Sequence, residues 1–197
     1  MNSAFIYTSK FDDFSLGEYH PFKPYRGTMT FELCYRYGLL DASWIKVLEP
    51  EPATEEVMLE YHQPQYVDAL KDANSGSFDF TMLEYGLGTG DNPVFKGEFD
   101  FSLLVLGATI LGAELLSKGK ADIVFSPTGG LHHAGYDHAE GFCYVNDIVI
   151  AINRLLKSGM KKIVYVDIDA HHGNGVQDAF YDRDDVLFIS LHQSGET

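Results

Sequence analysis

The chain has 197 residues, 45% of them apolar and 14% aromatic, so it is long enough to bury a core as one globular domain. Lys and Arg number 14 against 29 Asp and Glu, and the formal net charge of −15 disfavours direct contact with nucleic acid or anionic membranes. Neither Cys34 nor Cys143 belongs to a CxxC pair, and the first residues lack the basic and apolar regions of a signal peptide. We therefore expect a cytoplasmic protein without a disulfide framework.

The N-terminal half has a weak pattern of secondary structure. Residues 4–8 predict a short strand, and residues 29–40 predict a helix with one apolar face. A second helix is expected after Thr54, which can cap it, and a third after Pro64, which suits a first helical turn. Residues 85–93 are Gly-rich but lack the GxGxxG spacing and the GK[ST] ending, so they predict a loop and not a phosphate site. The expected face of the first helix comprises Phe31, Cys34, Tyr35 and Leu39.

From about residue 100 onward, helices and strands alternate. Residues 102–116 are the most apolar stretch, but they contain Glu114 and are shorter than the roughly 20 residues of a bilayer span, so we expect a buried helix. Apolar strands that alternate with helices predict an α/β fold with a parallel sheet covered by helices on both faces. The further expected elements are a strand at 121–126, a helix at 146–159, a strand at 161–169, a short helix near 176–182 and a strand at 185–192.

Polar side chains follow three of these predicted strands. Because the carboxyl ends of parallel strands meet at one edge of a sheet, we expect the loops there to form one site. Glycines beside the paired histidines of the first loop indicate a backbone that approaches another group closely. Six of the eight histidines lie in these loops: His132, His133, His138, His171, His172 and His192.

The segment DIDAHHGNGV, residues 167–176, places Asp167, Asp169 and His171 at i, i+2 and i+4, which a strand would project on one face. Asp and His are common in turns, and HGNG is a typical turn sequence. A turn would explain one or two of these residues but not all three. Three such groups on a core strand are costly unless they pair or hold a metal ion. Carboxylate with imidazole suits zinc, and also iron or cobalt, whereas Cys143 predicts a buried thiol and not a ligand. A metal ion beside two histidines predicts a hydrolase that activates water.

Four segments occur in a fixed order along the chain: GGLHHA, GFCYVND, VDIDAHHGNGVQDAF and ISLH. In sequence and order they resemble the zinc-dependent histone deacetylases, including their bacterial relatives of the acetoin-utilization and acetylpolyamine-amidohydrolase type. The resemblance runs from about Tyr19 to the last residue and implies a three-layer α/β fold with a central parallel sheet, shared with arginases. Leu131 stands where many eukaryotic members have Trp or Pro, which favours a prokaryotic relative.

The resemblance also implies roles for individual residues. Asp169 and His171 resemble two of the three protein ligands of a zinc ion, with Fe²⁺ as an alternative metal. His132 and His133 resemble the tandem catalytic histidines. Asp167 would be the partner of His132, and Asn174, where many members have Asp, that of His133. Asp91, Gly141 and Phe142 match substrate-binding positions, and Arg26 matches an internal channel. The residues that match a site for K⁺ or Na⁺ are Asp167, Asp169, His171, Ser190 and Leu191.

The leading interpretation is a metal-dependent amidohydrolase that converts an acetyl-lysine peptide or protein, or a small acetylated amine, to acetate and free amine. His133 would deprotonate the attacking water. An arginase-like dimanganese hydrolase is an alternative, although that class has a carboxylate two residues after the histidine, where this chain has Gly173. A third interpretation is an inactive truncated fragment or interaction module.

In the family, the third zinc ligand, a transition-state Tyr and a second tunnel aromatic lie downstream of the segment that residues 190–197 resemble. Residues 1–197 therefore resemble the N-terminal portion of a single deacetylase-like catalytic domain, and we expect little activity from them alone. A parallel sheet that ends there would expose a strand edge and apolar faces, so we expect a homo-oligomer or association with a missing C-terminal half.

Overall fold

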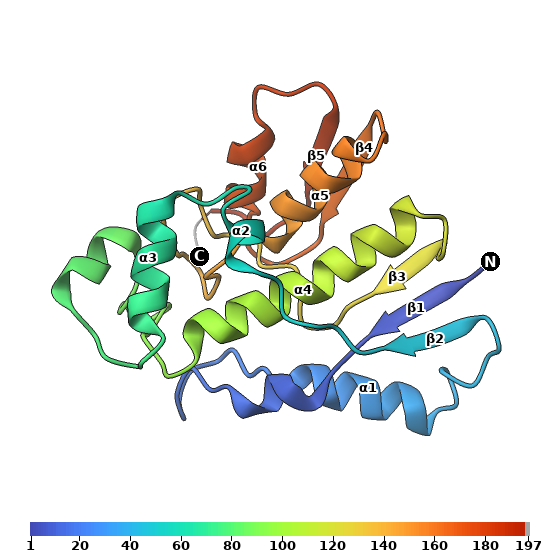
Figure 1. Cartoon of the computed structure of the whole chain (residues 1–197), viewed down its shortest axis with the longest axis horizontal. Helices are drawn as coiled ribbons and strands as arrows, with labels where there is room; N and C mark the ends of the chain where they lie inside the picture. The colour runs from blue at the N-terminus through green and yellow to red at the C-terminus, as the bar shows by residue number, and fades with distance from the viewer. Residues whose placement is uncertain (196–197) are drawn as a thin grey trace.

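The computed structural model describes residues 1–195, and the strands in this range pair in parallel. Strand β1 (Ser3–Ile6) lies between β2 (Ile45–Leu48) and β3 (Ile123–Phe125), while β4 (Ile163–Asp167) pairs with β5 (Val186–Ser190) (Figure 1). The parallel pairing confirms the prediction, but the hydrogen bonds divide the strands into a three-stranded and a two-stranded sheet.

The helices largely follow the sequence pattern. Strand β2 was not predicted, and the helix expected at 29–40 begins and ends earlier. Gly38, with a φ of +67°, ends that helix, so Leu39 lies beyond it and is exposed. The helices are α1 (Arg26–Arg36), α2 (Glu55–Met58), α3 (Pro64–Ala73), α4 (Glu98–Ser117), α5 (Asp147–Lys157) and α6 (Asn174–Phe180), with 3₁₀ helices η1 (Ser9–Asp13) and η2 (Phe80–Tyr85).

The three-stranded sheet is the middle layer of a helix–sheet–helix stack. From α1, the ring of Phe31 stacks on Tyr7 with centroids 4.2 Å apart. Helix α4 crosses the other face, where Gly112 allows the helix to approach Val124 of β3 closely (Figure 1). Helix α4 is long and apolar enough to cross a membrane, but most of it is buried inside the protein, which confirms the predicted core helix.

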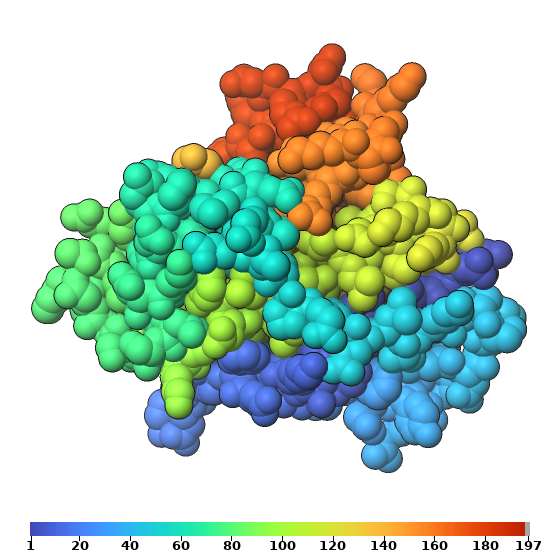
Figure 2. All heavy atoms as spheres, in the orientation of Figure 1, coloured from blue at the N-terminus to red at the C-terminus, as the bar shows by residue number. Residues whose placement is uncertain are grey.

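The two-stranded sheet is covered on one face. Helices α5 and α6 pack there through a second apolar cluster, which includes Val149, Val176 and Phe180. The opposite face of β4 and β5 exposes Val164, Val166, Leu187 and Ile189. Within residues 1–195, helices therefore cover only one face of β4 and β5. The part of the chain that contains this sheet, coloured orange to red, projects from the rest of the molecule in Figure 2.

Candidate active site

The loops after β3 and β4 line a cavity of about 510 Å³, which the first residue of α1 also borders. Because both strands end at the same side of the fold, their loops meet although they lie far apart in the sequence. The cavity brings together many of the residues predicted from the sequence: Arg26, Asp91, His132, His133, Gly141, Phe142, Asp169 and His171.

His132 and Asp167 form a buried pair. The Nδ1 atom of His132 lies 2.7 Å from Oδ2 of Asp167, which ends β4. The hydroxyl of Tyr165 donates to the same oxygen at 2.6 Å, and the backbone N–H of Asp169 donates to Oδ1 at 3.0 Å. Burial alone would raise the pKa of Asp167, but the hydrogen bonds from Tyr165, Asp169 and His132 lower it below its ordinary value. The ionised carboxylate thus holds the imidazole of His132 in one orientation.

His133 has a neutral partner. Its Nδ1 atom donates to Oδ1 of Asn174 at 2.7 Å, and Nδ2 of Asn174 donates to Oε2 of Glu140 at 2.7 Å. Because the amide oxygen can only accept, Nδ1 carries the hydrogen and Nε2 keeps its lone pair. Burial lowers the pKa of His133, opposed by the hydrogen bond to Asn174. The ring is therefore neutral near pH 7 and able to accept a proton at Nε2.

Asp169 and His171 lie in a turn and not on a strand, because β4 ends at Asp167. The backbone N–H of His171 donates to Oδ1 of Asp169 at 2.8 Å, and Nδ1 of His171 lies 3.1 Å from the same oxygen. The strand alternation expected from the sequence is thus wrong for these two residues. Short-range hydrogen bonds from backbone N–H groups to Asp side chains bring them together instead.

The chemistry of Asp169 and His171 fits a zinc ion, since carboxylate and imidazole are common zinc ligands. They contact each other, so a bound ion would replace their mutual hydrogen bond. Residues 1–195 contain no group of three or more His, Cys, Asp or Glu side chains placed to hold a metal, whereas a catalytic zinc ion usually takes three protein ligands. Burial raises the pKa of Cys143 to about 12, as expected of an inert buried thiol.

Gly141 and Phe142 adopt an unusual backbone beside His133. Phe142 has a φ of +72°, and no other non-glycine residue in the described range has a positive φ. A Cβ atom at Gly141 would lie 2.3 Å from Cδ2 of His133, so only glycine lets the backbone pass against that ring. Left-handed backbone at a bulky residue is strained, and such strain concentrates at functional sites.

Two residues that the sequence analysis missed support this turn. His20 lies edge-on to Phe142, with ring centroids 4.7 Å apart, and its Nε2 donates to the carbonyl oxygen of Asp91 at 3.0 Å. Buried Asn92 accepts from the backbone N–H of Phe142 at 3.3 Å. These contacts join the exposed Asp91 at the rim to Phe142 in the wall of the cavity.

The residues proposed for a monovalent cation lie at the ends of β4 and β5. Asp167 and Ser190 are register partners, and the N–H of Leu191 donates to the carbonyl oxygen of Asp167 at 2.9 Å. The N–H of Asp169 contacts the Asp167 side chain, and His171 follows in the same turn. The structure therefore gathers these residues, although one backbone oxygen already accepts a hydrogen bond.

Comparisons with known proteins agree over nearly the whole chain. A family model described as "Histone deacetylase domain" matches residues 20–197. Histone deacetylase 1 of Homo sapiens is 40% identical over 98% of this chain and 40% of its own length, and histone deacetylase RPD3 of Saccharomyces cerevisiae is 37% identical over 98% of this chain and 44% of its length. A crystal structure of an HDAC homolog from Aquifex aeolicus matches with a TM-score of 0.89 and 36% identity, covering 98% of this chain and 52% of that one. The chain thus spans less than half the length of these curated relatives.

Proposed function

The chain belongs to the histone deacetylase family, and from that premise we propose that its protein is a zinc-dependent deacetylase that converts an acetylated lysine, or a related small acetylated amine, to acetate and free amine. One observation carries the proposal: His132 and His133, each with a different partner, share a cavity with Asp169 and His171.

In this proposal, His133 is the general base. Its Nε2 accepts one proton from the water that attacks the acetyl carbonyl, and it then donates that proton to the departing amine. Asp167 fixes the tautomer of His132, which keeps that ring beside the reacting group. A zinc ion held by Asp169 and His171 would polarise the acetyl carbonyl and lower the pKa of the attacking water.

The same cavity accounts for substrate binding. We assign Phe142 and Gly141 to the wall that the acyl-lysine stem contacts, and Asp91 to the rim, where its carboxylate would accept backbone N–H groups of a peptide. Arg26 would border the inner channel, and K⁺ or Na⁺ would bind at the ends of β4 and β5. The protein would be cytoplasmic, and its net charge of −15 disfavours direct contact with nucleic acid or membranes.

The geometry disfavours the dimanganese alternative. A Cβ atom at Gly173 would lie 2.3 Å from Oδ2 of Asp167 and 3.3 Å from Nδ1 of His132. A carboxylate at this position, which a second metal ion would require, would therefore displace the buried His132–Asp167 pair.

Replacing Asp169 or His171 with alanine is expected to remove bound zinc and deacetylation together, because each variant lacks a ligand bond. Zinc content after dialysis and acetate release from an acetyl-lysine peptide and an acetylated diamine measure both effects. His192→Ala is the control, because His192 bonds Ser190 and does not line the cavity. Full zinc occupancy in both ligand variants would place the metal site elsewhere.

The open face of β4 and β5 suggests how the site is completed. We propose that residues 1–197 are the N-terminal portion of a single catalytic domain and that further polypeptide, from the same protein or from a second copy, covers Val164, Val166, Leu187 and Ile189. The support is the exposed apolar face, the two available metal ligands and the 52% coverage of the Aquifex structure.

The 197-residue chain alone is therefore expected to self-associate and to turn over acetyl-lysine poorly. Light scattering should show species larger than a monomer, and Val166→Thr combined with Leu187→Thr should reduce association without unfolding, because both side chains are exposed. Met29→Thr, at an exposed apolar position on α1, is the matched control. A soluble, active monomer would contradict the proposal.

A further inference from the structure

The segment that carries His132 and His133, residues 130–134, contains no helix or strand. The contacts described above orient the two rings but do not explain what holds the backbone beneath them. That backbone must stay within a fraction of an ångström for both Nδ1 atoms to keep their partners. Its contacts lead to the first turn of α5.

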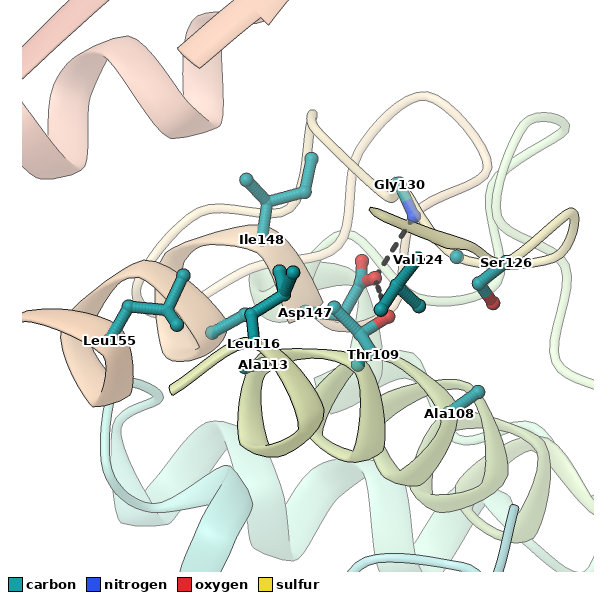
Figure 3. A pocket seen from close by; sticks show the side chains of 13 residues that line it. Ala108, Thr109, Ala113, Leu116, Val124, Ser126, Gly130, Asp147, Ile148 and Leu155 are labelled. Carbon is teal, nitrogen blue, oxygen red and sulfur yellow. Dashed lines mark hydrogen bonds between the residues drawn. The ribbon is translucent and has the colours of Figure 1, made fainter. Parts of the chain in front are cut away.

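Asp147, the first residue of α5, holds the N-terminal side of this segment. Its side chain is fully buried, its Oδ1 accepts the backbone N–H of Leu131 at 2.8 Å, and its Oδ2 accepts that of Gly130 at 2.9 Å. The hydroxyl of Thr109 on α4 donates to the same Oδ2. Figure 3 shows the carboxylate of Asp147 between Thr109 and Gly130. The three residues line a mostly apolar cavity of about 300 Å³. The carboxylate thus binds the two residues directly before His132.

Asn146 holds the C-terminal side. Its Nδ2 donates to the carbonyl oxygen of Ala134 at 2.9 Å, and its Oδ1 caps α5 by accepting from the N–H of Val149 at 3.1 Å. Its own N–H donates to Nε2 of buried His62 at 2.9 Å. Two consecutive buried residues therefore bind both ends of the histidine segment.

Two glycines allow close packing around this segment. A Cβ atom at Gly129 would lie 2.8 Å from Oδ2 of Asp147. A Cβ atom at Gly175 would lie within 2.8 Å of the carbonyl oxygens of His132, His133 and Ala134. The segment is thus packed between the first turns of α5 and α6.

We propose that Asp147 is a positioning residue for the two histidines, with Asn146 as its counterpart at the other end of the segment. Asp147 acts through the N–H groups of Gly130 and Leu131, which fix the position of the backbone that carries the rings of His132 and His133. The inference rests on the proposed function for what those rings do, but the geometry it describes does not depend on turnover. An acidic residue in a first helical turn also stabilises the helix itself, so the experiment must separate the two roles.

¹⁵N NMR of the histidine rings separates the positioning role of Asp147 from its stabilisation of the helix, because it reports which ring nitrogen carries the hydrogen. Wild-type protein should show His132 and His133 as single Nδ1–H tautomers. In Asp147→Asn, an amide nitrogen faces one of the two backbone N–H groups, so both rings should lose the single-tautomer pattern. Thr109→Val removes a hydrogen bond to the same carboxylate but none to the segment, and it should keep the wild-type pattern.

Amide hydrogen exchange gives a second readout, and its measurement on the wild-type protein does not depend on whether a variant folds. The amides of Gly130 and Leu131 should exchange as slowly as those in the core of α4, and about tenfold or more faster in a folded Asp147→Asn. Unchanged ring tautomers in Asp147→Asn, equal changes in Thr109→Val, or fast exchange at Gly130 and Leu131 in wild type would each overturn the proposal. A wild-type protein that shows the expected ring tautomers but releases no acetate would count against the proposed function and not against the positioning role of Asp147.

Discussion

Replacing His133 with alanine is expected to lower the rate of deacetylation by about 10²–10⁴-fold, because the group that takes the proton from water is lost. Zinc content should stay at the wild-type level, since Asp169 and His171 are unchanged. His138→Ala is the matched control: His138 lies in the same loop, but it is exposed and its Nδ1 contacts Asp137 at 2.8 Å. Steady-state rates with an acetyl-lysine peptide, measured with metal analysis, check the prediction.

The pH profile gives this prediction a second test. Burial lowers the pKa of His133 below 6.5, so the neutral base should persist into mildly acidic solution and the rate should fall as pH drops through that lowered pKa. Asn174→Asp places a carboxylate beside Nδ1 and should move the acidic limb of the profile to higher pH. An acidic limb that is unchanged in Asn174→Asp would assign the base to another group.

Replacing Glu98 with leucine is expected to stabilise the protein by roughly 2 to 4 kcal/mol at pH 8. Glu98 lies in the first turn of α4, fully buried; its Oε2 accepts the N–H of Phe95, and its Oε1 has no partner in the structure. Burial raises the pKa of Glu98 to about 8, although the N–H of Phe95 lowers it. The folded protein thus keeps this carboxyl protonated where the unfolded chain ionises it.

The sign of the pH dependence follows from the pKa of Glu98, which is 4.5 in the unfolded chain and about 8 in the folded protein. Below pH 4.5 the carboxyl is protonated in both states and makes no pH-dependent contribution. Between pH 4.5 and 8 the free energy of unfolding falls by about 1.4 kcal/mol per pH unit. Leucine removes this loss, but it leaves the N–H of Phe95 unpaired, which reduces the net gain. Denaturant unfolding of both proteins from pH 4 to 9 measures the difference. Asp100→Asn, exposed in the same helical turn, is the control, and a difference that does not grow with pH would refute the burial argument.

Local patterns in the sequence were enough for the strongest elements. The apolar run at 102–116 predicted helix α4, Pro64 marked the first turn of α3, and the pattern at 146–159 predicted helix α5. These signals act within a few residues, because they arise from side-chain spacing and from the hydrogen bonds of a helix terminus. Strand β2 has no such signal, since a four-residue strand is defined only by its neighbour β1.

The sequence by itself also determined that the loops after the predicted strands meet, because parallel strands bring their carboxyl ends to one edge. The resemblance to the family indicated which residues pair there, and the structure joins His132 to Asp167 and His133 to Asn174.

Only the tertiary structure decided how they meet. The hydrogen bonds of His132 with Asp167 and of His133 with Asn174 join residues 35 and 41 positions apart. Those that Asp147 accepts from Gly130 and Leu131 join residues 17 and 16 positions apart. The sequence predicted exposed apolar surface, but only the structure shows that it lies on one face of β4 and β5, because the sequence of an apolar strand does not tell which face a helix covers. Burial is a property of the packed chain, and for these groups packing sets the chemistry.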